Sequence, residues 1–130
     1  MWHAIIGSMK GDTMYTVYYY PACGTCKKAL KWLESKSIEV ELKHIVEATP
    51  SVEVLKEAYG KSGLTLNKFF NTSGKKYREL NMKDEQKNMT EDEILTLLAS
   101  EGMLIKRPIL IGEDFALVGF KEAQCDEKVI

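Results

Sequence analysis

A Cys-x-x-Cys motif, Cys23-Gly24-Thr25-Cys26, lies between a strand-like and a helix-like segment. Residues 15–20 are all aromatic or β-branched, which favours a strand, and apolar residues at helical spacing follow Cys26. The start of a helix has unpaired N–H groups and the positive end of the helix dipole, so a cysteine there has a lowered pKa. A second cysteine one turn away can close a disulfide with the first. The motif therefore predicts thiol redox chemistry.

Length and charge restrict the class of protein. A chain of 130 residues with 45% hydrophobic residues is the size of one domain with a core of its own. Its 18 basic and 19 acidic residues leave a net charge of -1, so we expect no direct binding to nucleic acid. Three cysteines do not make a disulfide scaffold, and we find no signal peptide and no apolar run of about 20 residues that would span a membrane. We expect a cytoplasmic protein without membrane association.

The first residues differ in character from the remainder of the chain. Residues 1–9 resemble an expression leader that contains a Gly-Ser cloning scar, and residues 10–13 add no periodicity. We expect residues 1–13 to be a leader or disordered, and residues 14–130 to form the single domain. In an alternative interpretation Met9 is the natural start, which leaves the motif unchanged.

The opening of the domain reads as β-α-β. Residues 15–20 form the first strand, and residues 26–35 form a helix with an apolar stripe. Residues 38–45 alternate apolar and polar side chains, as a half-exposed strand does.

Helical signals then dominate for about 50 residues. Thr49-Pro50 supplies an N-cap and a proline for the first helical position, and that helix runs to Gly60 or Gly63. A short helix is expected over 64–70, a loop over 71–74, and another short segment from Tyr77 to Leu80. Thr90 and Glu93 make a capping box for a further helix that Gly102 ends.

The C-terminal part of the chain is predicted to have the order β-β-α. Residues 109–111 and 115–118 are expected strands joined by a turn at 112–114, and residues 121–128 are an expected helix. The whole order, β-α-β, helical insert, β-β-α, predicts an α/β protein with a mixed central sheet and a thioredoxin-like fold.

The cysteines have predicted roles within this fold. Cys23 is the expected nucleophile, attacking a disulfide, a sulfenic acid or an oxyanion such as arsenate, and Cys26 resolves the intermediate as a Cys23–Cys26 disulfide. Two alternatives remain open: a zinc site, although Cys125, His44 and His3 provide no second ligand pair at zinc-like spacing, and a pair of inert buried thiols. Cys125 is expected to be a packing residue, and His44 an ordinary strand residue.

Arg107-Pro108 is the second candidate feature. In thioredoxin-like folds the proline that begins the strand opposite the reactive cysteine is typically cis. A preceding arginine can clamp a tetrahedral oxyanion with its planar fork or lower the pKa of the thiol. A surface ion pair is the alternative fate of such an arginine. Arg78 is the only other arginine.

The chain resembles the ArsC/Spx family, which contains glutaredoxin-linked arsenate reductases and the Spx and MgsR transcriptional regulators. The resemblance extends from about Met14 to Lys128. Its motifs are Tyr20-Pro21-Ala22-Cys23-Gly24-Thr25-Cys26-Lys27-Lys28-Ala29, Phe69-Phe70-Asn71-Thr72-Ser73-Gly74, Tyr77-Arg78-Glu79-Leu80, Gly102-Met103-Leu104-Ile105-Lys106-Arg107-Pro108-Ile109-Leu110 and Val118-Gly119-Phe120-Lys121-Glu122.

The resemblance implies roles and partners. It implies that Cys23 attacks arsenate, that Arg78 and Arg107 belong to the oxyanion site, and that Pro108 is the structural proline of that site. The glutaredoxin-linked reductases lack a second cysteine and have a third arginine, whereas this chain has Cys26 and no arginine after Arg107. We therefore expect an arsenate reductase-like thiol oxidoreductase with no bound cofactor, which takes electrons from thioredoxin or from glutathione and glutaredoxin. The alternative is an Spx-type redox-sensing regulator, which shares the cysteine pair and binds the RNA polymerase α subunit.

Overall fold

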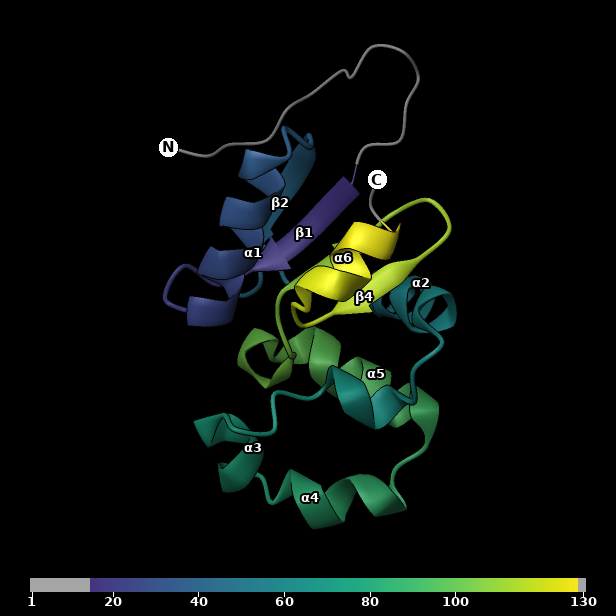
Figure 1. Cartoon of the computed structure of the whole chain (residues 1–130). Helices are drawn as coiled ribbons and strands as arrows, with labels where there is room; N and C mark the ends of the chain where they lie inside the picture. The colour runs from purple at the N-terminus through teal and green to yellow at the C-terminus, as the bar shows by residue number, and fades with distance from the viewer. Residues whose placement is uncertain (1–14, 129–130) are drawn as a thin grey trace.

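Four strands form the sheet of the computed structural model, which describes residues 15–128. They are β1 (Tyr15–Tyr19), β2 (Val40–His44), β3 (Ile109–Ile111) and β4 (Ala116–Val118), in the order β2-β1-β3-β4 (Figure 1). β1 pairs with β2 in parallel, and the other two pairings are antiparallel. The predicted mixed sheet and the hairpin near the C-terminus are therefore confirmed.

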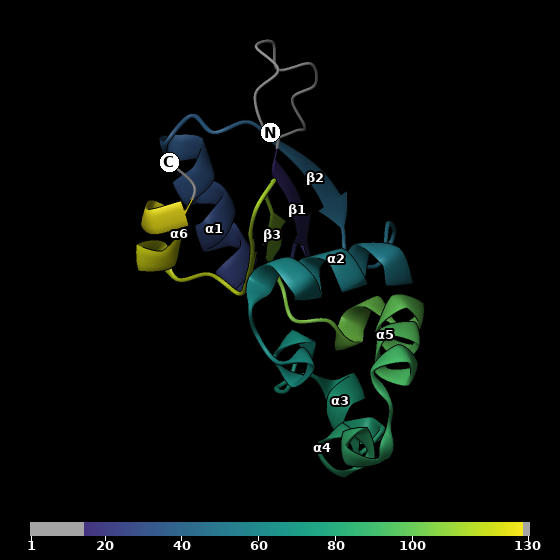
Figure 2. The same ribbon diagram turned by 90° about the vertical axis from the view of Figure 1, so that its right-hand side faces the viewer.

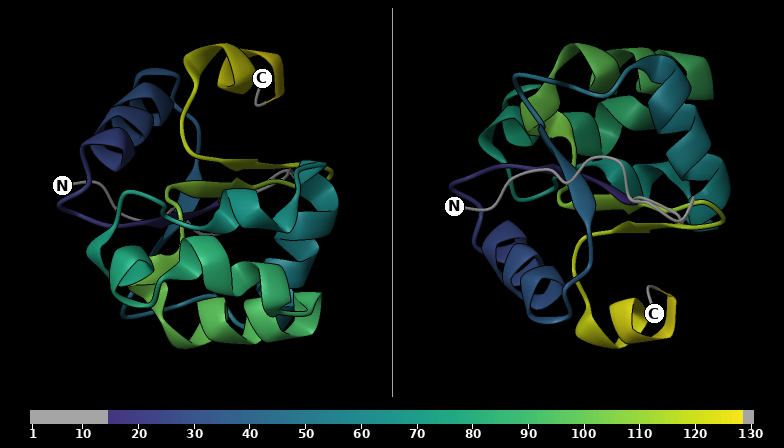
Figure 3. Two further views of the ribbon diagram at one scale, coloured as in Figure 1. Left: turned by 90° about the horizontal axis from the view of Figure 1, so that it is seen from below. Right: turned by 90° about the horizontal axis from the view of Figure 1, so that it is seen from above.

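Helices cover both faces of this sheet. α1 (Gly24–Ser35) and α6 (Glu122–Lys128) lie on one face, and the helices between β2 and β3 lie on the other (Figure 3). The latter form the predicted helical insert: α2 (Val52–Ser62), η1 (Leu66–Phe69), α3 (Lys75–Glu79), α4 (Met82–Glu85), η2 (Gln86–Asn88), α5 (Glu91–Ser100) and η3 (Gly102–Leu104). Of these, α3 and α4 lie farthest from the strands (Figure 2). None of the described helices is long and apolar enough to cross a membrane.

The core has two parts because neighbouring residues of a strand point to opposite faces. Val17 is buried towards α1 and α6, whereas Tyr18 is buried towards the insert. The first cluster also contains Trp32, Leu33, Val40, Leu110 and Cys125. The second is larger and includes Ile45, Leu55, Phe69, Phe70, Leu95, Leu98, Leu104 and Ile105. The sheet is thus held between two apolar layers, which fixes the position of the β1–α1 junction.

Helix α1 begins two residues before the predicted start at Cys26. Cys23 is its N-cap residue, with extended backbone (φ -87°, ψ 120°), and Gly24 and Thr25 form the first turn. Those two residues are exposed, so apolar periodicity gave no sign of them. The placement of Cys23 at the start of the helix is confirmed.

The predicted start of the next helix is wrong. Ser51, not Thr49, is the N-cap of α2, and its hydroxyl accepts a hydrogen bond from the Val54 N–H at 3.2 Å. Pro50 therefore precedes the cap and does not occupy the first helical position. The Thr49 hydroxyl instead donates to the Val46 carbonyl at 2.9 Å. Serine is the better N-cap residue of the two, so residue type alone favours Ser51 over Thr49.

The sequence predicted that Gly102 ends the preceding helix, and this prediction is wrong. The capping box of Thr90 and Glu93 is confirmed, but α5 ends at Ser100 and Glu101 is already extended. Gly102 is buried instead, and a Cβ there would clash with the Ile45 carbonyl oxygen. Glycine is required by the close approach of two backbones. The expected leader, residues 1–13, lies outside the described residues.

Two glycines of α2 give a paired stability prediction. Gly60 lies inside the helix with open space around its Cα, whereas Gly63 is the C-cap at φ +71°. We expect Gly60→Ala to raise the free energy of unfolding by about 0.5–1 kcal/mol, and Gly63→Ala to lower it by about 1 kcal/mol because alanine is strained in the left-handed region. Urea unfolding of both variants checks this, and a stabilising Gly63→Ala would contradict it.

Candidate active site

The cysteine pair is held by the end of β1. The backbone N–H of Cys23 donates to the Tyr20 carbonyl at 3.0 Å, and the backbone N–H of Tyr20 donates to the Cys26 sulfur at 3.4 Å. Cys23 is partly exposed, whereas Cys26 is buried, and both are free thiols. The Cys23 thiol is therefore accessible to a substrate, whereas the Cys26 thiol is shielded from solvent.

The pKa of Cys23 is lowered. Partial burial opposes its ionisation, but hydrogen bonds from the backbone N–H groups of Cys26 and Thr25 and from the Cys26 thiol, together with the charge of Arg107, outweigh the burial. This balance is the one expected of a cysteine at a helix start. Of the two thiols, Cys23 is thus the more readily ionised.

The second thiol behaves in the opposite way. Burial raises the pKa of Cys26 to about 12, and the hydrogen bond to Cys23 and the charge of the Cys23 thiolate add to the increase. The Tyr20 N–H and Arg107 oppose it without cancelling it. Cys26 stays protonated while Cys23 is a thiolate, and its proton stabilises that thiolate.

These pKa directions predict the pH dependence of alkylation. We expect the rate of iodoacetamide attack on Cys23 to rise through an inflection at a lower pH than for a cysteine in a short unstructured peptide, while Cys26 stays unmodified across that range. Arg107→Gln should move the inflection upward, because a charge that favours the thiolate is lost. Mass-spectrometric peptide mapping assigns the modified residue. An inflection at or above that of the peptide contradicts the prediction.

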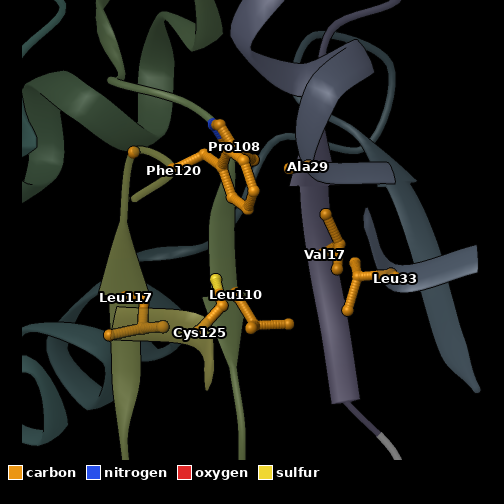
Figure 4. Close-up of a pocket in the computed structure, with 9 residues that line it drawn as sticks. Val17, Ala29, Leu33, Pro108, Leu110, Leu117, Phe120 and Cys125 are labelled. Atoms are coloured by element: carbon orange, nitrogen blue, oxygen red, sulfur yellow. The ribbon is translucent and has the colours of Figure 1, made fainter. Parts of the chain in front are cut away.

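Pro108 lies against the helix that bears the cysteines. The Arg107-Pro108 peptide bond is cis, as predicted, and the Pro108 carbonyl accepts a hydrogen bond from the Gly119 N–H at 2.8 Å. Pro108 and Ala29 of α1 share the wall of a small apolar cavity of about 10 Å³ (Figure 4). Cys125 lines the same cavity and is 5% exposed, which confirms it as a packing residue. Pro108, which directly precedes β3, is thus held beside α1.

The structure brings Arg107 to the cysteine pair. Its guanidinium carbon lies 5.0 Å from the centre of the Tyr20 ring, and its Nη1 donates to the carbonyls of Met103 and Ile105, each at 3.3 Å. Its positive charge favours ionisation of both Cys23 and Cys26, lowering the pKa of each from what burial alone gives. Arg107 is half-buried, so this charge is less screened than that of a surface residue.

Arg78 contacts a different part of the molecule. It is exposed on α3, where its Nη1 donates to the Ser73 carbonyl at 3.0 Å. A cleft of about 590 Å³ extends from Arg107 towards α3. Its lining residues are Asn71, Ser73, Gly74, Lys75, Lys76, Glu79, Met103 and Arg107. The cleft thus joins Arg107 to Asn71 and two lysines, and Arg78 is not part of its lining.

Tyr20 and His44 are the residues that sequence reasoning missed at this site. His44 is the last residue of β2, as predicted, but its Nδ1 also accepts hydrogen bonds from the N–H groups of Val46 and Glu47 at 3.1 and 3.2 Å. Its ring also contacts Tyr20 edge-on, with 5.6 Å between ring centres. A histidine at the end of a parallel strand, beside the cysteine loop, was the available signal.

Residues 15–128 contain no group of three or more histidine, cysteine or carboxylate side chains placed to hold a metal ion. The groups gathered here are two thiols, one guanidinium and backbone N–H donors. Such a set can attack and hold an electrophile, and can store two electrons as a dithiol.

Two proteins of Bacillus subtilis are similar to this chain in sequence. YusI of Bacillus subtilis, an uncharacterized protein, is 59% identical, covering 86% of this chain and 95% of YusI. The regulatory protein MgsR of the same organism is 30% identical, with 87% and 88% of the two chains covered.

Solved structures agree as well. An ArsC family related protein from Bacteroides fragilis has a TM-score of 0.84 and 46% identity, over 87% of this chain and 95% of that one. A possible arsenate reductase from Streptococcus mutans has a TM-score of 0.80 and 38% identity, over 88% and 99%. The expected thioredoxin-like fold is confirmed. The ArsC family model matches residues 18–128, and the chain therefore belongs to the ArsC family.

Proposed function

We propose that this ArsC family protein is an arsenate reductase-like thiol oxidoreductase, with Cys23 as nucleophile and Cys26 as resolving thiol. The observation that carries the proposal is a partly exposed cysteine at the start of α1 with a buried cysteine one helical turn away, and the opposite directions of their pKa shifts agree with it. A partly exposed thiolate can attack the substrate first. A buried, protonated thiol can then attack the sulfur of the covalent intermediate. The similarity to a possible arsenate reductase supports arsenate as the electrophile.

The reaction proceeds in two covalent steps. The Cys23 thiolate attacks arsenic, an S–As bond forms, and one arsenate oxygen leaves as water after protonation. Cys26 then loses its proton and attacks the Cys23 sulfur, so an S–S bond forms and the S–As bond breaks. The bonding pair stays on arsenic, which leaves as arsenite. One arsenate and two thiols thus give one arsenite, one disulfide and one water.

The disulfide must then be reduced from outside. Thioredoxin, or glutathione with glutaredoxin, supplies two electrons by thiol–disulfide exchange at the more exposed Cys23 sulfur. The protein itself binds no cofactor in this proposal. The cytoplasm, where we place the protein, keeps both reductants available.

The arginines hold the anion in the proposal. Arg107 is half-buried beside Cys23, where its planar guanidinium can pair with two oxygens of a tetrahedral oxyanion. Arg78, on the more distant α3, is the second arginine and acts on the incoming anion at longer range.

Their positions predict unequal effects. We expect Arg107→Gln to lower kcat/KM for arsenate by about 10²-fold, because a charge-assisted contact with the anion is lost, and Arg78→Gln to lower it by less than about fivefold. Steady-state kinetics with both variants checks this, and Lys56→Gln, at an exposed position of α2, serves as the surface-charge control. Equal losses for Arg78→Gln and Arg107→Gln would contradict the ranking.

The experiment that tests the function is NADPH-coupled turnover with arsenate. The reduced protein is assayed separately with a thioredoxin system and with glutathione plus glutaredoxin. Turnover with either system supports the reductase and identifies its reductant. No turnover with either, in a protein whose Cys23–Cys26 disulfide forms reversibly, contradicts it.

A second function is favoured by one observation, the 30% identity to the regulatory protein MgsR. In this alternative the same cysteine pair senses oxidation, and the protein binds the RNA polymerase α subunit instead of turning over a substrate. Binding of the purified α subunit that differs between the reduced and oxidised protein, with no arsenate turnover, would select it.

A further inference from the structure

Tyr20 contacts both cysteines through its backbone. Its carbonyl accepts the Cys23 N–H at 3.0 Å, and its own N–H donates to the Cys26 sulfur at 3.4 Å. These bonds depend on the backbone alone, so another side chain at this position would leave them in place. The side chain of Tyr20 is therefore free to have a separate role.

The Tyr20 ring lies next to Arg107. The guanidinium carbon is 5.0 Å from the ring centre, within the range of a cation–π contact. The ring is half-buried, packs against the larger core cluster and meets the His44 ring edge-on. His44 is in turn held by two backbone N–H groups. The ring is thus a fixed surface against which the guanidinium can rest.

The other contacts of Arg107 position it weakly. Both hydrogen bonds come from one nitrogen, Nη1, and both are 3.3 Å, beyond the usual range for N–H···O bonds. None of the ion pairs among residues 15–128 includes Arg107. The ring is the remaining contact that can hold the planar group in one orientation.

We propose that Tyr20 is a positioning residue, whose ring holds the Arg107 guanidinium beside Cys23. The proposal rests on the proposed function only in treating Cys23 as the reactive thiol. It assigns the aromatic ring, and not the hydroxyl, because the contact with Arg107 is made by the ring face. Tyr20→Phe should therefore keep the arrangement and Tyr20→Leu should lose it.

Charge-selective alkylation of Cys23 tests this without any reductase assay. Iodoacetate is an anion and iodoacetamide is its neutral analogue, so the ratio of their rate constants at Cys23 reports the local positive charge. At one pH the thiolate fraction cancels from the ratio. We expect Tyr20→Leu and Arg107→Gln each to lower the ratio by about fivefold, and the double variant to lower it no further than Arg107→Gln alone.

Tyr19→Leu is the matched control. Tyr19 also contacts the His44 ring edge-on, at 5.9 Å, but its side chain packs in the other core cluster. Tyr20→Phe and Tyr19→Leu should both keep the ratio of the native protein. Circular dichroism checks that each variant is folded, and Tyr20→Met replaces Tyr20→Leu if the latter unfolds.

Three outcomes would overturn the proposal. They are an unchanged ratio in the folded Tyr20→Leu or Tyr20→Met variant, an equal fall in Tyr19→Leu, and a double variant whose fold-change is the product of the two single fold-changes. All three differ from failure of the proposed function, because alkylation of Cys23 is measured whether or not arsenate is reduced. A protein without turnover that still shows the Tyr20 effect would refute the reductase alone.

Discussion

We expect Cys23→Ser to lower arsenate-dependent turnover by about 10³-fold or more. Cys23 is the thiol with the lowered pKa and the more exposed position, and a serine hydroxyl at the same place is not ionised at neutral pH. No other described thiol is available to replace it, because Cys26 and Cys125 are both buried. Coupled NADPH oxidation measures the loss.

Cys125→Ala is the control for this variant. It removes a thiol from the apolar cluster under α6 and should lower the free energy of unfolding by about 1 kcal/mol while leaving turnover unchanged. Full activity of Cys23→Ser, or a large loss in Cys125→Ala without unfolding, would contradict the assignment of the nucleophile.

Cys26→Ser should divide the reaction between its two covalent steps. Cys23 can still attack, but no internal thiol resolves the intermediate, so we expect turnover with thioredoxin to fall by about 10²-fold or more. A mixed disulfide between Cys23 and the reductant should accumulate and be visible by non-reducing electrophoresis and mass spectrometry. With glutathione and glutaredoxin the loss should be smaller, because glutathione can attack the Cys23 sulfur directly.

The state of Cys23 in this variant gives the control. The serine hydroxyl can donate to the Cys23 sulfur as the Cys26 thiol does, so the inflection of the Cys23 alkylation profile should stay below that of a free cysteine, whereas Cys26→Ala, which lacks the donor, should move it upward. If Cys26→Ser retained native turnover with thioredoxin, Cys26 would not be the resolving thiol.

The order of elements could be predicted because each has a local cause. β1 is aromatic and β-branched, α5 has a capping box that the structure shows in full, and the β3–β4 hairpin has its turn residues in sequence. The same is true of Cys23, whose position depends only on the change from strand to helix. These features need no knowledge of distant parts of the chain.

The errors have tertiary causes. Gly102 is required by the backbone at Ile45, which is 57 residues earlier in the sequence. The contacts of Arg107 with Tyr20 likewise join two segments far apart in the chain. Sequence reasoning could identify Arg107 and Arg78 as candidates. It could not predict which of them lies beside Cys23, because that depends on how the helical insert folds.

The most direct test of the account is a single turnover without external reductant. The fully reduced protein is mixed with arsenate, and both arsenite and the remaining free thiols are measured, with peptide mapping of the product. The account predicts one arsenite for each protein molecule, and a disulfide between Cys23 and Cys26 with Cys125 still in the thiol form. A protein that keeps all its thiols and forms no arsenite would contradict it.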